Sequence, residues 1–336
     1  MHILVTGSSG FIGRRVVETA VDEGYRVSGL DLVAQREQER GDVRLRADVE
    51  RAMRGVDAVI HLAARVGLER DFGDSPEYVD HNGTGTAVVL SAAARAGVST
   101  VVTASSMVVY GEGLAVCASH GLVRPGPRTP EALLARSYEP PCPACGADLE
   151  PHAVTEEAPL DPRNVYAASK VLQEHLAASW ARAQRGHAIH LRFHNVYGPG
   201  APRDNPYSGV ASIFLSAVLA GRAPQVTEDG GQRRDFVHVR DVARACIAAL
   251  EAPVPDGQSR AYNIASGTPR TVGEMAMRLA AAAGSPTPVV TGNGRLGDVR
   301  HITASADRAA RELGWRARED FAESIAELIA IERRAH

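Results

Sequence analysis

The chain has 336 residues, of which 44% are hydrophobic and 23% charged, a composition that is ordinary for a globular protein with a buried core. Its formal net charge of -3 argues against binding to nucleic acid or to an anionic membrane surface, and no apolar run is long enough to span a bilayer. Four cysteines in a chain of this length do not form a disulfide scaffold, so we expect a cytoplasmic protein.

Short apolar runs alternate with helix-spaced amphipathic segments in the first part of the chain. Buried strands are predicted at residues 2–6, 26–31, 43–46, 58–61 and 100–103, and helices near 11–23, 76–96 and 163–184. Since a core strand begins at the second residue, we expect no signal peptide before it. Strands and helices that alternate are joined by right-handed crossovers, which predicts an α/β fold with a Rossmann-like, doubly wound parallel sheet.

The second part of the chain is less regular and is punctuated by glycine and proline, as at Gly198-Pro199-Gly200. We therefore predict a Rossmann nucleotide-binding domain over residues 1–195 and a smaller, mixed α/β substrate-binding domain over 196–336, with 235–265 returning to the first domain. Residues 112–157 interrupt the first domain as a Cys/His-rich insertion, because they lack periodicity and hold three of the four cysteines.

A glycine-rich segment, Thr6-Gly7-Ser8-Ser9-Gly10-Phe11-Ile12-Gly13, follows the first predicted strand and opens the first helix. Gly7 permits a tight turn, Gly10 lets the backbone approach a pyrophosphate, and Gly13 lets helix and strand pack closely. A glycine triplet alone is a weak signal, but the strand before it and the helix after it are what a dinucleotide site requires.

Acidic residues at the ends of the next two predicted strands favour a particular dinucleotide. Asp31 lies 18 residues beyond Gly13, where a carboxylate accepts hydrogen bonds from ribose hydroxyls and repels a 2′-phosphate. This predicts NAD rather than NADP, although an ordinary strand-end cap is the alternative for Asp31. Asp48 and Val49 follow the strand predicted at 43–46 and would suit the adenine edge.

Lys170 is the only lysine in the chain, and the other 36 basic residues are arginines. A position that retains lysine is expected to need a compact ammonium group, unless it is a chance survivor. Tyr166 lies four residues earlier, so one helical turn would bring the phenol and the ammonium to the same face. A nearby cation lowers the pKa of a phenol from its ordinary value of about 10, which favours Tyr166 as an acid/base.

Two serines, Ser105 and Ser106, follow the strand predicted at 100–103, at the carboxyl edge where such sheets place their ligands. A serine hydroxyl at this edge can share a substrate oxygen with Tyr166. The glycine turn, the strand-end serines and the Tyr-x3-Lys pair together predict an oxidoreductase-like site.

Two Cys/His pairs flank a proline-rich connector within the insertion. Cys117 and His120 form one pair, Cys142 and Cys145 the other, and both have the spacing of zinc knuckles. Three thiolates and one imidazole suit a closed tetrahedral zinc site, which would also explain how a segment with little apolar content stays folded. A redox-active Cys142/Cys145 pair and a site that no longer binds metal are the alternatives.

Taken together, these motifs resemble the extended short-chain dehydrogenase/reductases, which include nucleotide-sugar 4-epimerases, 4,6-dehydratases and decarboxylases. The resemblance runs in order and at family spacing through residues 6–13, 61–64, 82–84, 105–111, 166–170, 192–199 and 234–239. It implies that Tyr166 is the acid/base, Lys170 its electrostatic partner and Ser106 the second hydrogen-bonding residue.

The same resemblance implies contacts to the two ligands. Cofactor contacts are expected at Phe11, Ile12, Leu62, Ala63 and Ala64, besides the glycines, the acidic residues and Val49 above. Tyr166 and Lys170 are expected to contact the cofactor too, with Lys170 bonding the nicotinamide ribose. Asn195, Arg234 and Arg300 would hold the diphosphate of a dTDP- or UDP-linked sugar, since the arginine fork matches phosphate oxygens.

Departures from the family pattern reduce the number of reactions that we expect this chain to catalyse. The 4,6-dehydratases carry an Asp-Glu pair after the strand-end hydroxyl residue, where this chain has Met107 and Val108, and the glutamate usual in the decarboxylases is absent too. We therefore expect a 4-epimerase that oxidises C4, turns the ketone and returns the hydride to the opposite face with NAD held permanently. The alternatives are a 4-ketoreductase or dehydrogenase, and a non-catalytic nucleotide-sensing scaffold on the same fold.

The Cys/His insertion resembles the dTDP-L-rhamnose 4-epimerase branch of the family, which favours a dTDP-6-deoxyhexose as substrate and a role in deoxysugar biosynthesis. Which sugar is bound depends on loops near Val66-Gly67-Leu68 and Tyr207-Ser208-Gly209, whose shape the sequence does not give.

We also expect a homodimer in which the helices near 76–96 and 163–184 of each subunit form a four-helix bundle. The small and apolar residues that suit this packing are Ala87, Val88, Leu90 and Ala92, with Val171, Leu172, Leu176 and Ala177.

Overall fold

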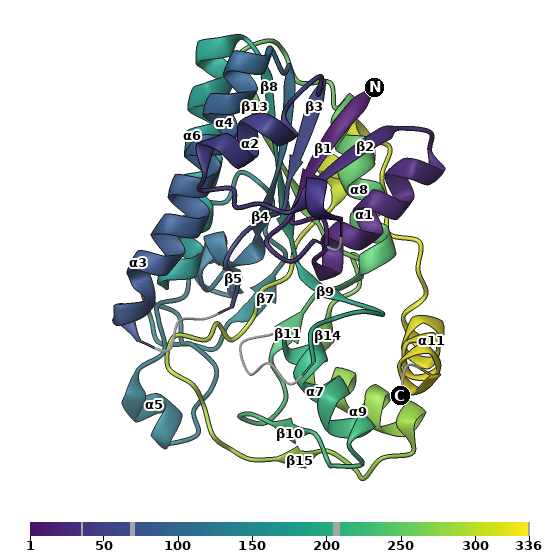
Figure 1. Cartoon of the computed structure of the whole chain (residues 1–336). Coiled ribbons are helices and arrows are strands. Elements are labelled where there is room, and N and C mark those ends of the chain that lie inside the picture. Colours follow the sequence, from purple (N-terminus) through teal and green to yellow (C-terminus); the bar gives the residue numbers. More distant parts are fainter. Residues whose placement is uncertain (35, 68–70, 204–208, 335–336) are drawn as a thin grey trace.

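A six-stranded, all-parallel sheet forms the centre of the computed structural model, which describes residues 1–34, 36–67, 71–203 and 209–334 (Figure 1). The strands run in the spatial order β2 (Arg26–Leu30), β1 (His2–Thr6), β3 (Ala58–His61), β4 (Thr100–Ser106), β8 (His187–Phe193) and β13 (Ser259–Ile264). Every neighbouring pair is parallel, so the predicted Rossmann-like sheet is confirmed. No helix in the described ranges is long and apolar enough to cross a membrane.

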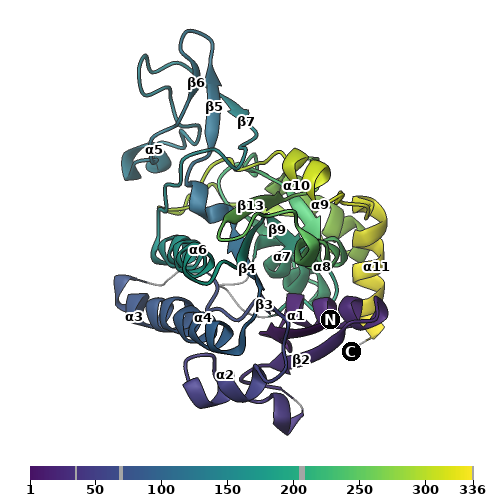
Figure 2. The same cartoon turned by 90° about the horizontal axis from the view of Figure 1, so that it is seen from above.

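Helices cover both faces of this sheet (Figure 2). On one side, Ile3 and Val5 of β1 share a core with α1 (Phe11–Asp22) and α8 (Val239–Ala248). On the other side, Leu4 packs in a second core with α2 (Arg46–Ala52), α4 (Gly85–Ala96) and α6 (Val165–Gln184). Because alternate side chains of a strand point to opposite faces, a strand buried on both sides has consecutive apolar residues, as Ile3, Leu4 and Val5 of the first strand are.

The strand predicted at 43–46 is absent from the described structure. A turn takes its place, in which the Asp42 carboxylate accepts from Arg44 N at 2.9 Å and the Asp48 carboxylate accepts from Asp42 N at 3.0 Å. These side-chain hydrogen bonds compete with a strand ladder, and α2 begins directly afterwards at Arg46. Val43 is still buried, which explains why the short apolar run resembled a strand.

The helix predicted near 76–96 is present but is not uniform. It consists of α3 (Ser75–Tyr78), a π-helical stretch η3 (Val79–Thr84) and α4. The helix predicted near 163–184 is α6, whose N-cap Asn164 accepts from Ala167 N at 2.8 Å.

Residues after 195 build a smaller, mixed α/β region below the carboxyl edge of the sheet (Figure 1). Its core is formed by α7 (Val210–Leu219), α9 (Val272–Ala283) and α11 (Phe321–Arg334). Its paired strands are β9 (Asn195–Tyr197) with β12 (Phe236–His238), β10 (Gln225–Val226) with β15 (Val289–Val290), and β11 (Arg233–Arg234) with β14 (Arg270–Thr271). Two elements of this part of the chain, α8 and β13, belong to the main sheet and its helices instead, because β13 pairs with β8 and α8 packs on α1.

The insertion projects from the main body as a separate lobe (Figure 2). It contains an antiparallel sheet of β6 (Gly121–Val123), β5 (Leu114–Cys117) and β7 (Glu150–His152), and the helix α5 (Pro130–Leu134). The remaining short elements are η1 (Glu37–Glu39), η2 (Phe72–Asp74), η4 (Met107–Tyr110), η5 (Ala249–Glu251) and α10 (Asp307–Glu312).

Candidate active site

The glycine turn joins β1 to α1 at the carboxyl edge of the sheet. Gly7 has φ +69°, and a Cβ added there would lie 2.8 Å from Ala63 N, while one on Gly13 would lie 1.9 Å from Gly7 O. The fold itself therefore requires these two glycines. A Cβ on Gly10 would meet only Gly7 O, at 3.2 Å, and no side chain of the described residues caps α1. The first amides of α1 are thus open to an anion such as a pyrophosphate.

Asp31 and Asp48 both hold backbone amides of their own chain. Asp31 accepts from Ser9 N at 2.9 Å and from Val33 N at 3.0 Å, which fixes its carboxylate beside the glycine turn. Asp48 accepts from Asp42 N, and this bond and an ion pair with Arg51 hold the pKa of its carboxyl below the usual range. Each carboxylate would have to share its oxygens between these bonds and the adenosine of a dinucleotide.

The expected cofactor contacts after β3 lie directly against this turn. Leu62 N donates to Thr6 O at 3.2 Å, and Ala63 N donates to Thr6 Oγ1, also at 3.2 Å. The segment from Leu62 to Ala64 therefore lines the turn on the side of β3, as a wall for anything bound at the start of α1.

Tyr166, Lys170 and Ser106 converge at the carboxyl end of β4. Burial raises the pKa of Tyr166 to about 12, and a side-chain hydrogen bond with Ser106 opposes this rise. The Lys170 ammonium lies 5.8 Å from the centre of the Tyr166 ring and donates to Ala104 O at 2.8 Å. Burial lowers the pKa of Lys170 to about 7, against the opposing charge of Glu174. The i and i+4 spacing thus places phenol and ammonium on one face of α6, as expected from the sequence.

A buried amide ties this triad to the loop after β3. Asn82, in the π-helical stretch η3, donates to Ser169 Oγ at 2.8 Å and accepts from Arg65 N at 2.8 Å. Ser169 precedes Lys170 on α6, so the Asn82 amide fixes the triad helix relative to residue 65. The resemblance marked the 82–84 segment, but only the fold reveals what its asparagine contacts.

A second buried chain of hydrogen bonds runs beneath the triad from β1 to α6. His61 contacts Thr6 Oγ1 at 2.7 Å and Thr86 Oγ1 at 3.0 Å, and Gln173 donates to Thr86 at 2.7 Å. Burial and the charge of Lys170 lower the pKa of His61 to about 3, so its imidazole is neutral. No local pattern in the sequence indicates these contacts, because their partners lie far apart along the chain.

Of the three expected diphosphate contacts, Asn195 and Arg234 are available to a ligand. Asn195 Oδ1 is buried and has no hydrogen-bond partner among the described residues, which is costly unless a ligand or water supplies one. Within the described part of the chain, the Arg234 guanidinium donates to carbonyl oxygens, those of Arg233 and Arg300 at 2.9 Å and Val299 at 2.6 Å. Burial lowers the pKa of Arg234 to about 10, which still leaves it cationic.

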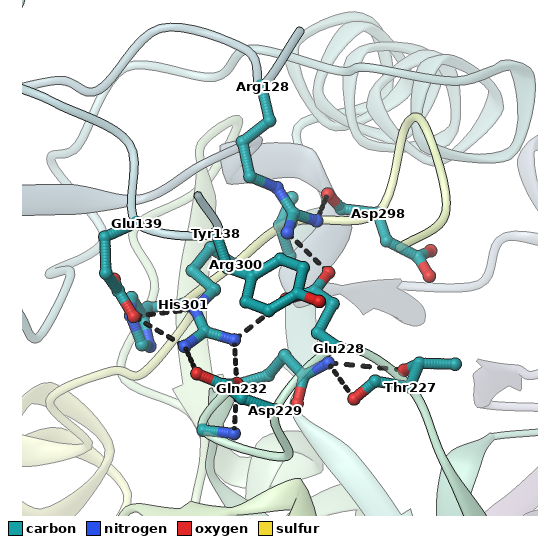
Figure 3. A network of polar contacts seen from close by, with 12 residues as sticks. Arg128, Tyr138, Glu139, Thr227, Glu228, Asp229, Gln232, Asp298, Arg300 and His301 are labelled. Carbon is teal, nitrogen blue, oxygen red and sulfur yellow. Dashed lines mark hydrogen bonds and ion pairs between the residues drawn. The ribbon is translucent and has the colours of Figure 1, made fainter. Parts of the chain in front are cut away.

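Arg300 has a different environment, shown in Figure 3. Its side chain is only 2% exposed, and its guanidinium contacts three carboxylates, those of Glu139, Glu228 and Asp229, at 2.6 to 3.0 Å. Each of its three nitrogens donates to at least one of these acids. The structure therefore does not present Arg300 as an unpaired cation, and a diphosphate contact would have to displace these acids.

The four predicted zinc ligands of the insertion come together. Their ligand atoms all lie within 4.8 Å of one another. Cys117 Sγ is 3.5 Å from His120 Nδ1 and 3.7 Å from Cys145 Sγ, and Cys142 Sγ is 3.8 Å from His120 Nδ1. A tetrahedron with ordinary zinc bond lengths requires about 3.8 Å between sulfurs and about 3.6 Å from sulfur to nitrogen. All four cysteines, each in the described part of the chain, are free thiols, so the arrangement fits zinc and no disulfide competes for it.

Part of the expected sugar-selecting loops, namely Leu68, Tyr207 and Ser208, lies outside the described residues. Of the neighbouring residues, Val66 is 60% exposed and therefore accessible to a ligand.

Comparison with known proteins places this geometry in a family. A model of the NAD dependent epimerase/dehydratase family matches residues 3–131 and 142–265, and the gap falls inside the insertion. The dTDP-L-rhamnose 4-epimerase of Burkholderia thailandensis is 31% identical over 345 residues, covering 97% of this chain and 93% of that protein. The UDP-glucose 4-epimerase of Mycolicibacterium smegmatis is 30% identical over 351 residues, covering 99% of each.

Solved structures agree in fold over the whole length. The UDP-glucose 4-epimerase of Thermus thermophilus, in complex with NAD, has a TM-score of 0.78 at 29% identity and covers 100% of both chains.

Proposed function

This chain belongs to the NAD dependent epimerase/dehydratase family, and from that premise we propose that it is an NAD-dependent 4-epimerase of a nucleotide-activated sugar. The observation that carries the proposal is the convergence of Tyr166, Ser106 and Lys170 at the end of β4. The open start of α1 at Gly10 is where the residues fit the pyrophosphate of NAD, with Asp31 toward the adenosine ribose.

The roles of the triad follow from its charges. Bound NAD would supply hydride removal from C4 and hydride return. Tyr166 would take the proton of the C4 hydroxyl as the ketone forms and give it back in the second half-reaction. Ser106 would hydrogen-bond the same substrate oxygen. Lys170 would favour the phenolate through its charge, because its ammonium lies 5.8 Å from the centre of the Tyr166 ring.

The residues after Ser106 favour epimerisation over dehydration. Met107 and Val108 occupy η4, and Met107 packs against an apolar cluster that contains Val109 and Tyr110. Neither side chain can donate or accept the proton that elimination of water requires. The 4-keto sugar would therefore turn and receive its hydride on the opposite face.

For the sugar, we propose a dTDP-6-deoxyhexose. The similarity to a dTDP-L-rhamnose 4-epimerase over 97% of this chain supports it, as does the zinc-type insertion. The similarity to UDP-glucose 4-epimerases at nearly the same identity makes a UDP-hexose the second candidate. Incubation with a panel of dTDP-, UDP- and GDP-sugars, followed by NMR of the anomeric and H4 signals, distinguishes them.

For the insertion, we propose one structural zinc ion bound by Cys117, His120, Cys142 and Cys145. The support is the near-tetrahedral set of ligand distances. All four positions would be filled by protein, so the ion would stabilise the lobe and take no part in the chemistry.

Substitution of Tyr166 tests the catalytic assignment. Tyr166→Phe is expected to abolish turnover but to leave the binding of NAD and of the sugar nucleotide within severalfold, because the phenol moves a proton and contributes little affinity. A rate above about a tenth of the wild-type rate would show that another group is the acid/base.

Dialysis of the wild-type protein separates the two enzyme classes. NAD that stays bound through dialysis supports the epimerase, whereas NAD that exchanges with the solvent supports the 4-ketoreductase alternative.

A further inference from the structure

The insertion reaches back to one particular segment, residues 292–301, in the smaller region of the molecule (Figure 3). Tyr138 Oη donates to Gly292 O at 2.7 Å, and Arg128 Nη2 donates to Asp298 O at 2.5 Å. Leu133 packs so closely that a Cβ added to Gly294 would lie 2.7 Å from its side chain. The insertion therefore contacts this segment at several points along its length, including the pairing of Glu139 with Arg300 and His301.

Glu228 lies opposite the insertion and closes this contact from the other side. Its carboxylate forms ion pairs with Arg128 and, at 2.8 Å, with Arg300, and the side chains of Arg128 and Glu228 are 3% and 2% exposed. Its backbone holds the same segment, because Glu228 N donates to Asn293 O at 3.0 Å and Gly292 N donates to Glu228 O at 3.1 Å.

Glu228 also has φ +52°, in the left-handed region that a non-glycine residue adopts at a cost. A strained backbone and a fully buried carboxylate both oppose stability. They persist only where the surroundings impose them, and such strain clusters at functional positions. The contacts that impose it here are the two arginines and the 292–301 segment.

Residues 292–301 in turn accept hydrogen bonds from the Arg234 side chain. The guanidinium of Arg234 donates to Val299 O at 2.6 Å and to Arg300 O at 2.9 Å, so the position of this cation depends on the backbone at 299 and 300. Arg300 N itself donates to Oε2 of Glu112, the first residue of the insertion, at 3.1 Å. A continuous set of contacts thus runs from the insertion through residues 292–301 to the candidate diphosphate contact.

We propose that the insertion is a clamp on the sugar-nucleotide site, in which Arg128 and Glu228 are positioning residues that fix residues 292–301 and, through them, Arg234. The clamp acts on binding of the nucleotide diphosphate, and it rests on the proposed function in that Arg234 is taken to contact this group. Arg300 acts as the central cation of the clamp, which accounts for its three carboxylate partners.

Arg128→Met tests the clamp, and Glu228 keeps its ion pair with Arg300 in this variant. The KM for the accepted sugar nucleotide, and the Kd of UDP and dTDP measured by calorimetry, are expected to rise about tenfold. The kcat and the bound NAD are expected to stay within twofold, since the triad lies on other elements. Arg128→Lys, which keeps one charged donor, is expected to recover part of the loss.

Arg124→Met provides the matched control. Arg124 is also an arginine of the insertion, but it contacts Pro159 O and Asp161 instead of the clamped segment, so its KM is expected to match wild type. If Arg128→Met is too unstable to purify, Glu228→Gln and Arg128→Lys are compared by the same two measurements. An unchanged KM and Kd in these variants, or a fall in kcat at constant KM, overturns the clamp. A wild-type protein that binds neither nucleotide and converts no sugar would instead refute the proposed function.

Discussion

Lys170 is buried, and its ammonium lies between the carbonyl of Ala104 and the ring of Tyr166. This environment explains why one lysine persists in a chain that otherwise uses arginine. A compact ammonium can donate to Ala104 O and still face the phenol, whereas a planar guanidinium is longer and has a fixed fork. If Lys170 were retained only by chance, nothing would explain why it is buried beside the ionisable phenol of Tyr166.

Lys170→Arg keeps the charge and changes only shape and donor geometry. If a positive field were sufficient, the variant would retain most of its activity. We expect a loss on the order of 100-fold in kcat, with weaker NAD retention, because a displacement of about 1 Å at a reacting centre costs this much. Steady-state rates and the bound NAD per chain measure both effects. An arginine variant with its cofactor and a near wild-type rate would contradict this explanation.

The Asp31 carboxylate holds Ser9 N and Val33 N, and we propose that it also binds a ribose of NAD. Asp31→Ala is expected to relax the preference for NAD over NADP, because the charge that repels a 2′-phosphate is removed. Asp31→Asn separates the roles, since it removes the charge but keeps one acceptor for the glycine turn. We expect both variants to narrow the ratio of NAD to NADP affinity measured by titration, and Asn to retain more NAD affinity. An unchanged ratio would place the discrimination elsewhere.

At the scale of elements, the insertion has small strands and few buried apolar side chains, so its order depends on other interactions. We expect one equivalent of zinc per chain in protein purified without chelator. Cys145→Ala should lower this far below one, whereas Cys246→Ala should not, because Cys246 is buried in the main core. Metal analysis of the three proteins decides between zinc and the redox-pair alternative. A wild-type zinc content far below one equivalent would contradict the site.

The molecule as a whole exposes part of the helical face expected to form a dimer. Leu90, Ala92 and Ala177 belong instead to the core of their own chain, because they point toward the sheet. Leu172 is 36% exposed and Val79 is 50% exposed, while Val88, Val171 and Leu176 are half-buried. The face that remains on η3, α4 and α6 is therefore narrower than the sequence indicated, with Leu172 and Val79 as its most exposed apolar side chains.

We therefore still expect a homodimer through these helices. Light scattering at micromolar concentration should give about twice the chain mass of 35.6 kDa. Leu172→Glu should shift the mass toward that of a monomer, because it places a charge in an apolar contact. Met277→Glu, at an exposed position on α9, is the control and should leave the mass unchanged. A monomer mass for the wild type refutes the dimer.

The sequence by itself determined the features that are local in the chain. The glycine turn, the i and i+4 spacing of Tyr166 and Lys170, and the alternation of strand and helix each depend on residues close together, so their patterns are readable. The zinc-type spacing is of the same kind. Where a local pattern was ambiguous, as at Val43, side-chain hydrogen bonds in a turn replaced the predicted strand.

Only the tertiary structure decided which distant groups meet. Nothing near Arg300 in sequence indicates that Glu139, Glu228 and Asp229 occupy its guanidinium, because these partners are 71 to 161 residues away. The same holds for Asn82 and Ser169, 87 residues apart. Arg300, which the sequence predicted as a contact to a diphosphate, is instead paired with three acids that the fold brings to it. Charge can be counted along the chain, but its pairing is a property of three-dimensional packing.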